Sequence, residues 1–261
     1  MYEILLEHPE VCMASGIKET HFFYSYFHKE AEWYYKFFRN CGHANAIGEI
    51  SNLYFYHQEV PKRIYELLPD VQIIACLRNP LERMASVYLY RKRSGEVDVS
   101  FEEALEKQPD LLTNNYYHSL LQNYLRYFDR DQITILFYED LEENPSSFVK
   151  QLYKALHVDE DYKPVNLYRT FNKSNKPRLK TFKQVVHFGS KFLRKIQMYG
   201  LLNNLKRNQC LRKILFQEIN GEFGEVIPDH IKDHLIQKLQ KEIEGIESLT
   251  GKNLDNWKKV H

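Results

Sequence analysis

An arginine and a serine lie close together in the sequence, at Arg78 and Ser86, and their chemistry suits the binding of a phosphate group. A guanidinium presents parallel N–H donors to an anion, and a serine hydroxyl adds a further donor. Phosphate groups bind readily where such donors converge near the beginning of a helix. Arg78 could instead simply cap the edge of a sheet, and the local pattern leaves both interpretations open.

The residues around Arg78 predict a strand, a turn and a helix. Val71–Leu77 is a short, almost continuous apolar run, which is typical of a strand buried on both faces of a parallel sheet. Pro80 cannot donate to a sheet but suits the first turn of a helix, which is predicted over Leu81–Arg93. Arg78 would therefore lie at the carboxyl end of a buried strand, where open α/β sheets bind ligands.

Length and composition fit one α/β domain with an ordinary core. The chain has 261 residues, of which 43% are hydrophobic and 14% aromatic. No apolar run approaches the ~18 residues of a membrane span, and the acidic residues among the first ten predict no signal peptide. The four scattered cysteines argue against a zinc site or a disulfide framework, and favour a reducing cytosol and hence a cytoplasmic location.

Positive charge is concentrated in one part of the chain. Between Asp161 and Glu218 there are nine lysines, five arginines and no acidic residue, although the whole chain has a formal net charge of +1. Such a segment favours an anionic partner, which could be a sulfated sugar, a nucleotide, a nucleic acid or an acidic membrane surface. It could equally be a solvated helical face. Of these anionic partners we expect no nucleic acid, and we keep a peripheral membrane contact through residues 163–213 as an alternative.

The sequence between Leu77 and Tyr88 resembles the 3′-phosphate-binding motif of the sulfotransferases that use 3′-phosphoadenylyl sulfate (PAPS). The shared pattern is L-R-N-P-x-x-R-x-x-S-x-Y. It is specific, because several residue types recur at fixed spacing on a strand–turn–helix. The resemblance implies that Arg78 and Ser86 hold the 3′-phosphate of the nucleotide. It also implies an α/β fold of three layers, like that of P-loop NTPases, with a central parallel sheet flanked by helices.

A second motif, near the N-terminus, supplies a candidate base. The element K-E-x-x-F-F at Lys18–Phe23 follows L-x-x-H-P-x-V at Leu5–Val11, as in the heparan-sulfate branch of the family and its bacterial relatives. Taken alone, Lys18 and Glu19 would be ordinary loop charges. The resemblance implies that Glu19 is the catalytic base, which takes the proton of the acceptor as it attacks sulfur. The residues implied in acceptor binding are Lys18, His21, Glu49 and Arg91.

Other segments match the family less closely. Tyr117 stands in a segment like the family's G-x-Y-x-x-x-L, with Asn115 in place of the glycine, and is a candidate nucleotide contact or a core residue. Lys176 and Arg178 belong to a basic loop of the kind that closes over the nucleotide, and are candidates for binding its phosphates. The segment that ends at Trp257 resembles the closing helix and tryptophan of bacterial sulfotransferases.

Three departures from the family pattern concern the acceptor. Asn52 replaces a usual proline, and Ile50 replaces a lysine that is frequent in the heparan-sulfate branch. Tyr90 stands where the N-sulfotransferase branch has a catalytic histidine. The departures at Ile50 and Asn52 argue against a heparan-like acceptor, and together with Tyr90 they favour a hydroxyl over an amine. The resemblance as a whole implies an acceptor hydroxyl, or amine, of a carbohydrate-type molecule or a small hydroxyl compound. The predicted co-substrate is PAPS, and no metal is expected.

One element of the family is not found in the 261 residues. Sulfotransferases have a strand and a loop of the approximate form G-x-x-K-x-G-T, which bind the 5′-phosphosulfate and should precede residue 1. We therefore expect a fold without this first strand and loop. Either the natural start lies upstream, or the chain is a degenerate homologue that only binds a nucleotide or an anionic glycan.

We expect one sulfotransferase domain over residues 1–261. Residues 1–160 would form its nucleotide-binding α/β core, and residues 161–261 a basic loop and a helical part. A nucleotide kinase with a related architecture is a further hypothesis. The absence of any G-x-x-x-x-G-K-(S/T) sequence argues against it.

Overall fold

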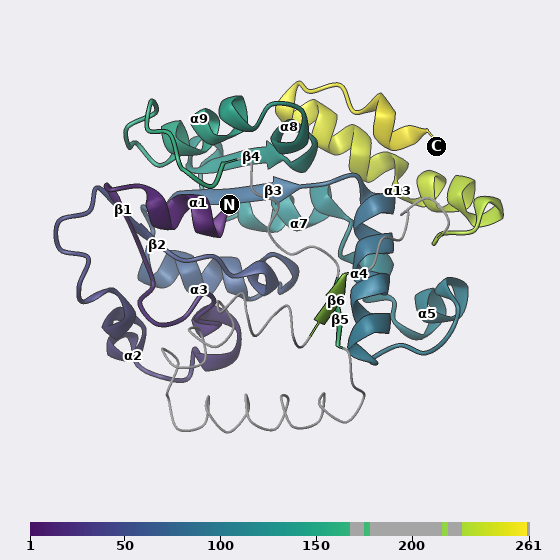
Figure 1. Cartoon of the computed structure of the whole chain (residues 1–261), viewed down its shortest axis with the longest axis horizontal. Helices are drawn as coiled ribbons and strands as arrows, with labels where there is room; N and C mark the ends of the chain where they lie inside the picture. The colour runs from purple at the N-terminus through teal and green to yellow at the C-terminus, as the bar shows by residue number, and fades with distance from the viewer. Residues whose placement is uncertain (168–174, 178–215, 219–225, 260–261) are drawn as a thin grey trace. The chain divides into compact units, whose positions relative to one another are not determined.

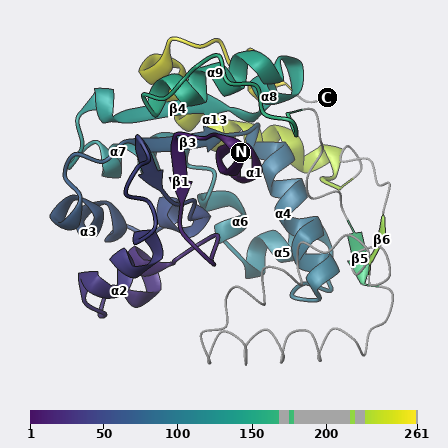
Figure 2. The same ribbon diagram turned by 60° about the vertical axis from the view of Figure 1, so that its left-hand side comes forward.

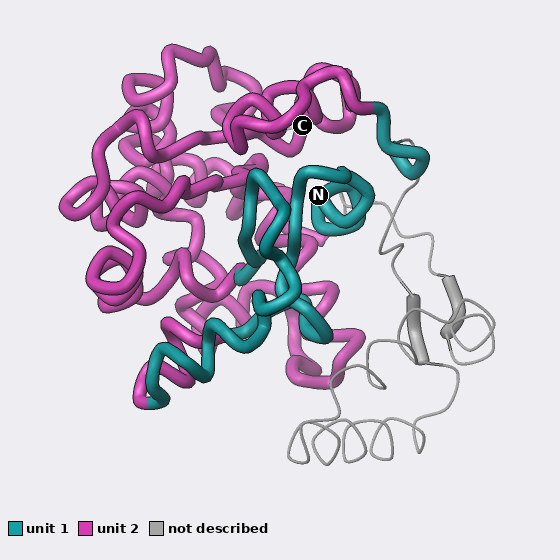
Figure 3. The backbone as a smooth tube through the Cα atoms, turned by 90° about the vertical axis from the view of Figure 1, so that its left-hand side faces the viewer, with its two compact units in different colours: residues 1–20, 29–51, 163–221 teal, residues 21–28, 52–162, 222–261 magenta. Residues whose placement is uncertain are grey.

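A computed structural model describes residues 1–167, 175–177, 216–218 and 226–259 of the chain (Figure 1). The chain forms two compact units, and each contains several separate segments (Figure 3). Unit 1 comprises residues 1–20, 29–51 and 163–221, and unit 2 comprises residues 21–28, 52–162 and 222–261. The predicted functional division near residue 160 stays a prediction.

Unit 1 contains a short pair of parallel strands. Strand β1 (Val11–Met13) pairs with β2 (Ala46–Gly48), with Val11 opposite Ala46. A second pair, β5 (Asn175–Pro177) and β6 (Phe216–Glu218), is antiparallel. The described helices of this unit are short: α1 (Tyr2–Glu7), α2 (Ala31–Tyr35) and the 3₁₀ helix η2 (Lys36–Phe38).

Unit 2 contains the predicted strand–turn–helix (Figures 1 and 2). Strand β3 (Ile73–Leu77) pairs in parallel with β4 (Ile133–Phe137) over the full length of both strands. Helix α4 (Pro80–Ser94) begins three residues after β3 ends. The strand and the helix predicted around Arg78 are therefore confirmed, and so is the parallel α/β class of the fold.

The other helices of unit 2 surround this strand pair. Helix α9 packs on β4, and the long C-terminal helix α13 packs on α7 and α4. In chain order these helices are the π-helix η1 (Phe22–Tyr26), η3 (Asn52–Tyr56), α3 (Val60–Leu67), α5 (Phe101–Lys107), α6 (Asp110–Thr113), α7 (Tyr117–Tyr124), η4 (Arg130–Gln132), α8 (Tyr138–Glu143), α9 (Pro145–Ala155), α13 (Asp229–Thr250) and η6 (Asp255–Lys258).

Local sequence determines where α4 begins and ends. The Oδ1 atom of Asn79 accepts hydrogen bonds from the backbone N–H groups of Leu81, at 3.0 Å, and Glu82, at 3.4 Å. Two of the N–H groups that a helix start leaves unpaired are thereby satisfied, and Pro80 suits the first turn. Gly95 ends the helix with a φ of 72°, a left-handed conformation that glycine adopts without strain.

The core of unit 2 joins side chains from both ends of its sequence. Burial of each large apolar side chain contributes about 1.5–3 kcal/mol to stability. Fully buried core residues include Met84, Leu121, Leu152, Tyr153, Leu235, Ile246 and Trp257.

Among the described residues, no helix is both long enough and apolar enough to cross a membrane.

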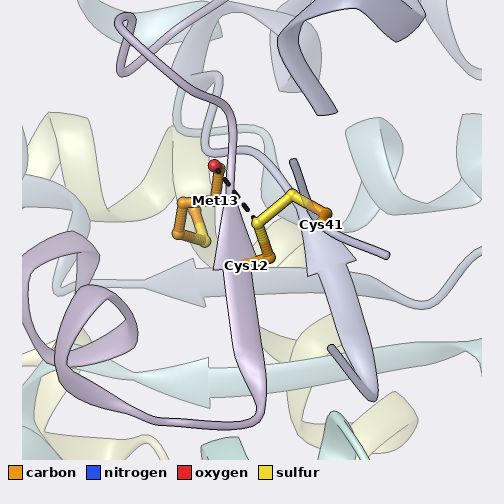
Figure 4. Close-up of a disulfide and its surroundings, with 3 residues drawn as sticks. All are labelled: Cys12, Met13 and Cys41. Carbon is orange, nitrogen blue, oxygen red and sulfur yellow. Dashed lines mark hydrogen bonds between the residues drawn. A yellow bond between two sulfur atoms is a disulfide. The ribbon is translucent and has the colours of Figure 1, made fainter. Parts of the chain in front are cut away.

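A disulfide joins Cys12 of β1 to Cys41, with the two Cα atoms 5.5 Å apart (Figure 4). The expectation that the cysteines do not pair is therefore wrong. The two cysteines are 29 positions apart in the sequence, and this spacing belongs to no recognisable motif that would predict the pair. The segment after α2 returns to β1, where the backbone N–H of Ser15 donates to the carbonyl oxygen of Phe37 at 2.8 Å. The cytoplasmic location stays a prediction, but the observation on which it rested is removed.

We predict that replacing Cys12 and Cys41 by serine lowers the free energy of unfolding by about 3 kcal/mol, because the disulfide restricts the unfolded chain. Urea denaturation with and without reductant measures this difference. Cys76→Ser, which removes a free exposed thiol, is the control and should change little. Free thiols at both Cys12 and Cys41 in protein purified without reductant would contradict the pairing.

Candidate active site

Arg78 lies at the carboxyl edge of the β3–β4 pair. Because Leu77 is opposite Phe137, Arg78 and Tyr138 are the first residues beyond the two strands. The guanidinium lies 4.6 Å from the centre of the Tyr138 ring, which is a cation–π distance. The Arg78 side chain is 21% exposed, so it is supported by the protein and still open to a ligand.

A carboxylate of the same chain segment pairs with Arg78. The Nε and Nη2 atoms of Arg78 donate to Oε2 of Glu82 at 3.0 and 2.8 Å. Ser86 lies one helical turn after Glu82, so their side chains share one face of α4. Ser86 is half-buried. The structure thus aligns the predicted phosphate-binding pair with an acidic residue between them, which sequence reasoning missed despite its i,i+4 spacing from Arg78.

Tyr117 supports the Arg78 backbone from α7. Its hydroxyl donates to the carbonyl oxygen of Arg78 at 3.0 Å, and its side chain is 3% exposed. Burial raises the pKa of Tyr117 well above its usual range, so the hydroxyl stays protonated and able to donate. The structure therefore gives Tyr117 a contact with Arg78, while the predicted contact with a nucleotide stays a prediction.

A buried polar network lies beneath Arg78. The Oδ1 atom of Asn115 accepts a hydrogen bond from Arg83 at 3.2 Å and lies 3.3 Å from the Tyr117 hydroxyl. The Asn115 amide donates to the carbonyl oxygen of Leu111 at 2.7 Å. Arg83 also donates to the hydroxyl of Tyr56. Asn115, which stands where the family pattern has a glycine, thus links these groups. The local sequence gave no sign of these contacts.

The predicted base lies in unit 1, in the loop that follows β1. Glu19 and Lys18 are half-buried, and the Lys18 ammonium is 5.5 Å from the centre of the Tyr2 ring. Glu49 holds this loop, because its Oε2 accepts the backbone N–H of Thr20 at 3.0 Å and the hydroxyl of Ser51 at 2.9 Å. The structure thus joins the segment of Glu49 to the loop that carries Lys18 and Glu19, because Glu49 binds Thr20, the residue next to Glu19.

The other two residues predicted to bind the acceptor belong to unit 2. His21 precedes η1 with a φ of 53°, an uncommon conformation outside glycine. Arg91 forms a two-point ion pair with Asp110 and donates to Oε1 of Gln108 at 2.7 Å. The hydrogen bond to Asp110 raises the pKa of Arg91. This pairing stabilises the end of α4, and a role of either residue in acceptor binding stays a prediction.

The remaining predicted positions are described by the structure only in part or not at all. Lys176 belongs to β5, whose backbone alone is described, and Arg178 lies outside the described residues. Most of the basic segment 163–213 lies outside them as well. In the described part of the chain, no cluster of three or more histidine, cysteine, aspartate or glutamate residues could hold a metal ion.

Comparison with known proteins identifies the family and the fold of the chain. A sequence model of the sulfotransferase domain family matches residues 1–221. Human bifunctional heparan sulfate N-deacetylase/N-sulfotransferase 2 is 29% identical over 172 residues, which cover 58% of this chain and 20% of that protein. Membrane-associated sulfotransferase kil1 of Dictyostelium discoideum is 30% identical over 117 residues, which cover 41% of this chain and 25% of that protein.

The chain therefore matches only about a fifth to a quarter of the length of these curated relatives. A solved structure covers more of it. The crystal structure of a sulfotransferase from Alicyclobacillus acidocaldarius superimposes with a TM-score of 0.69. The match covers 98% of this chain and 92% of the other, at 18% sequence identity. At this identity the match establishes a common fold, which is the P-loop-like fold predicted above.

We predict that Asn115→Ala lowers the free energy of unfolding by about 2 kcal/mol or more, because the Nη1 atom of Arg83 loses the buried oxygen to which it donates. Urea denaturation measures the change. Asn123→Ala is the matched control, since its amide donates to the carbonyl oxygen of Gln58 in an exposed position and should cost much less. Equal costs for the two variants would show that the network contributes little.

Proposed function

The chain belongs to the sulfotransferase family, and on that premise we propose that it transfers a sulfuryl group from PAPS to a carbohydrate-type acceptor. The acceptor atom is a hydroxyl oxygen or an amine nitrogen. The observation that carries the proposal is the Arg78 fork at the carboxyl edge of β3. Its Nε and Nη2 atoms already converge on one carboxylate oxygen, which is how a guanidinium also meets a phosphate oxygen.

Arg78 and Ser86 hold the 3′-phosphate of the nucleotide in this proposal. The phosphate replaces Glu82 at the Arg78 fork, because it carries more negative charge and more acceptor oxygens than one carboxylate. The exchange is feasible because the Glu82 side chain is 46% exposed and can turn into solvent. Ion pairs as exposed as this one contribute only about 0.2–1 kcal/mol.

Glu19 acts as the general base. Its carboxylate takes the proton of the acceptor O–H or N–H as that atom attacks sulfur. The new bond to sulfur forms while the bond between sulfur and the 5′-phosphate oxygen breaks, and 3′,5′-ADP leaves. Glu49 supports this role, because its hydrogen bond to the Thr20 N–H limits movement of the adjoining Glu19. A carbohydrate acceptor is supported by the heparan sulfate named for several relatives.

We predict that Arg78→Ala weakens the binding of 3′,5′-ADP at least tenfold, because the guanidinium is the main charged contact with the 3′-phosphate. Isothermal calorimetry measures the affinity. Glu82→Gln is the matched comparison and should bind about two- to threefold more tightly, since it removes the carboxylate that competes for Arg78. An unchanged affinity in Arg78→Ala would remove Arg78 from the site.

We predict that Glu19→Gln in the full-length protein abolishes sulfuryl transfer but leaves the affinity for 3′,5′-ADP unchanged, because the amide cannot accept the proton. Transfer of radiolabelled sulfate from PAPS to a heparan-derived oligosaccharide measures the activity. Glu32→Gln, an exposed change on α2, is the control. Turnover that survives Glu19→Gln would rule out the base role. Nucleotide binding without turnover in the wild type would favour the alternative of a binding module.

A further inference from the structure

The peptide group between Arg78 and Asn79 is held by side chains on both of its polar atoms. The Tyr117 hydroxyl donates to the carbonyl oxygen of Arg78 at 3.0 Å, and the N–H of Asn79 donates to Oε1 of Glu139 at 2.6 Å. The β3–β4 pairing ends one residue earlier, at Leu77 and Phe137. Two side chains from α7 and α8 therefore take over where the strand ladder stops.

Trp257 braces both of these side chains. Its indole Nε1–H donates to the same Oε1 atom of Glu139 at 3.1 Å. Its ring packs edge-on against the ring of Tyr117, with the centroids 6.0 Å apart. Trp257 is 1% exposed, so these contacts are shielded from solvent. The C-terminal segment thus reaches the peptide beside Arg78 through one buried aromatic residue.

Glu139 is costly for the stability of the fold. Its Oε2 atom is buried and has no hydrogen-bond partner among the described residues. Burial also raises the pKa of the Glu139 carboxyl, so its charged form is disfavoured in this position. A buried polar atom without a partner calls for an explanation other than stability. The position of Glu139 beside the Asn79 N–H supplies one.

The direction of the Arg78 side chain depends on this peptide. Rotation of the peptide plane would change ψ of Arg78 and φ of Asn79, and would move the guanidinium relative to α4. Asn79 also caps α4 through Oδ1, so one residue connects the clamped peptide to the helix that carries Ser86. A fixed peptide therefore keeps Arg78 and Ser86 in register.

We propose that Glu139 and Tyr117, braced by Trp257, are positioning residues that clamp the Arg78–Asn79 peptide and thereby aim Arg78 at the 3′-phosphate. The proposal rests on the function proposed above. None of the three residues needs to contact the nucleotide, because they act through the backbone of Arg78. Loss of the clamp should therefore reduce selectivity for the 3′-phosphate rather than nucleotide binding in general.

Amide hydrogen exchange followed by NMR tests the clamp without any ligand. In Glu139→Ala the amide of Asn79 should exchange at least tenfold faster than in the wild type, because its acceptor is removed. Glu242→Ala is the matched control, since the Oε2 atom of Glu242 also accepts a backbone N–H, that of Ser119 in α7, at 2.9 Å. It should leave Asn79 unchanged. Unchanged exchange at Asn79 in Glu139→Ala would overturn the clamp.

Calorimetry with 3′,5′-ADP and 5′-AMP tests the effect on Arg78. Glu139→Ala should lose about tenfold in affinity for 3′,5′-ADP and little for 5′-AMP, which lacks the 3′-phosphate. Glu139→Gln should restore most of the loss, because its amide oxygen still accepts the Asn79 N–H. If Glu139→Ala does not fold, Tyr117→Phe, which removes a single hydroxyl, is used in its place. It should lower the ratio of the affinity for 3′,5′-ADP to the affinity for 5′-AMP.

The results separate the two proposals. A wild-type protein that does not distinguish 3′,5′-ADP from 5′-AMP would overturn the 3′-phosphate function. A wild type that distinguishes them, together with a Glu139→Ala variant that keeps the same ratio, would overturn the clamp alone. Equal losses for both nucleotides in Glu139→Ala would assign Glu139 a purely structural role, and would also overturn it.

Discussion

The parallel pairing of β3 with β4 is the interaction on which the candidate site depends. Its register ends both strands at the same edge, so Arg78 and Tyr138 lie side by side. Helix α4 starts at that edge because Asn79 caps it and Pro80 fits its first turn. A shift of the register by one residue would turn Arg78 to the other face, and would separate it from both Tyr138 and Glu82.

Two arginines of unit 2 with similar exposure have different surroundings. Arg91 binds both carboxylate oxygens of Asp110, which match its charge, and donates a further hydrogen bond to Gln108, so both partners come from outside α4. Arg78 meets one oxygen of Glu82 and the face of Tyr138. Glu82 and Asp110 are about equally exposed, at 46% and 45%, so the two ion pairs differ in geometry: Arg78 binds one carboxylate oxygen and Arg91 binds two. Arg78 is therefore the one of the two that is better suited to exchange its partner for a phosphate.

Unit 1 holds the predicted base by different means. The disulfide between Cys12 and Cys41 ties β1 to the segment after α2, and the Ser15 N–H bonds to the Phe37 carbonyl oxygen next to it. Glu49 then binds the backbone at Thr20. These constraints restrict a loop that has no regular secondary structure between Ala14 and His21. General-base catalysis requires such restriction, because the carboxylate must meet the acceptor proton at hydrogen-bond distance.

Sequence alone determined the strand, the turn and the helix around Arg78, because an apolar run and a proline act over a few neighbouring residues. It also determined the family, since the pattern from Leu77 to Tyr88 is local. Only the tertiary structure paired Cys12 with Cys41, Tyr117 with the Arg78 carbonyl oxygen, and Glu139 with Asn79 and Trp257. These partners are separated by 29 to 118 positions, and no period or motif marks such pairs. In unit 2, folding brings these partners together because the core buries Trp257 against Phe137 of β4 and Tyr117 of α7, and packs α13 on α7 and α4.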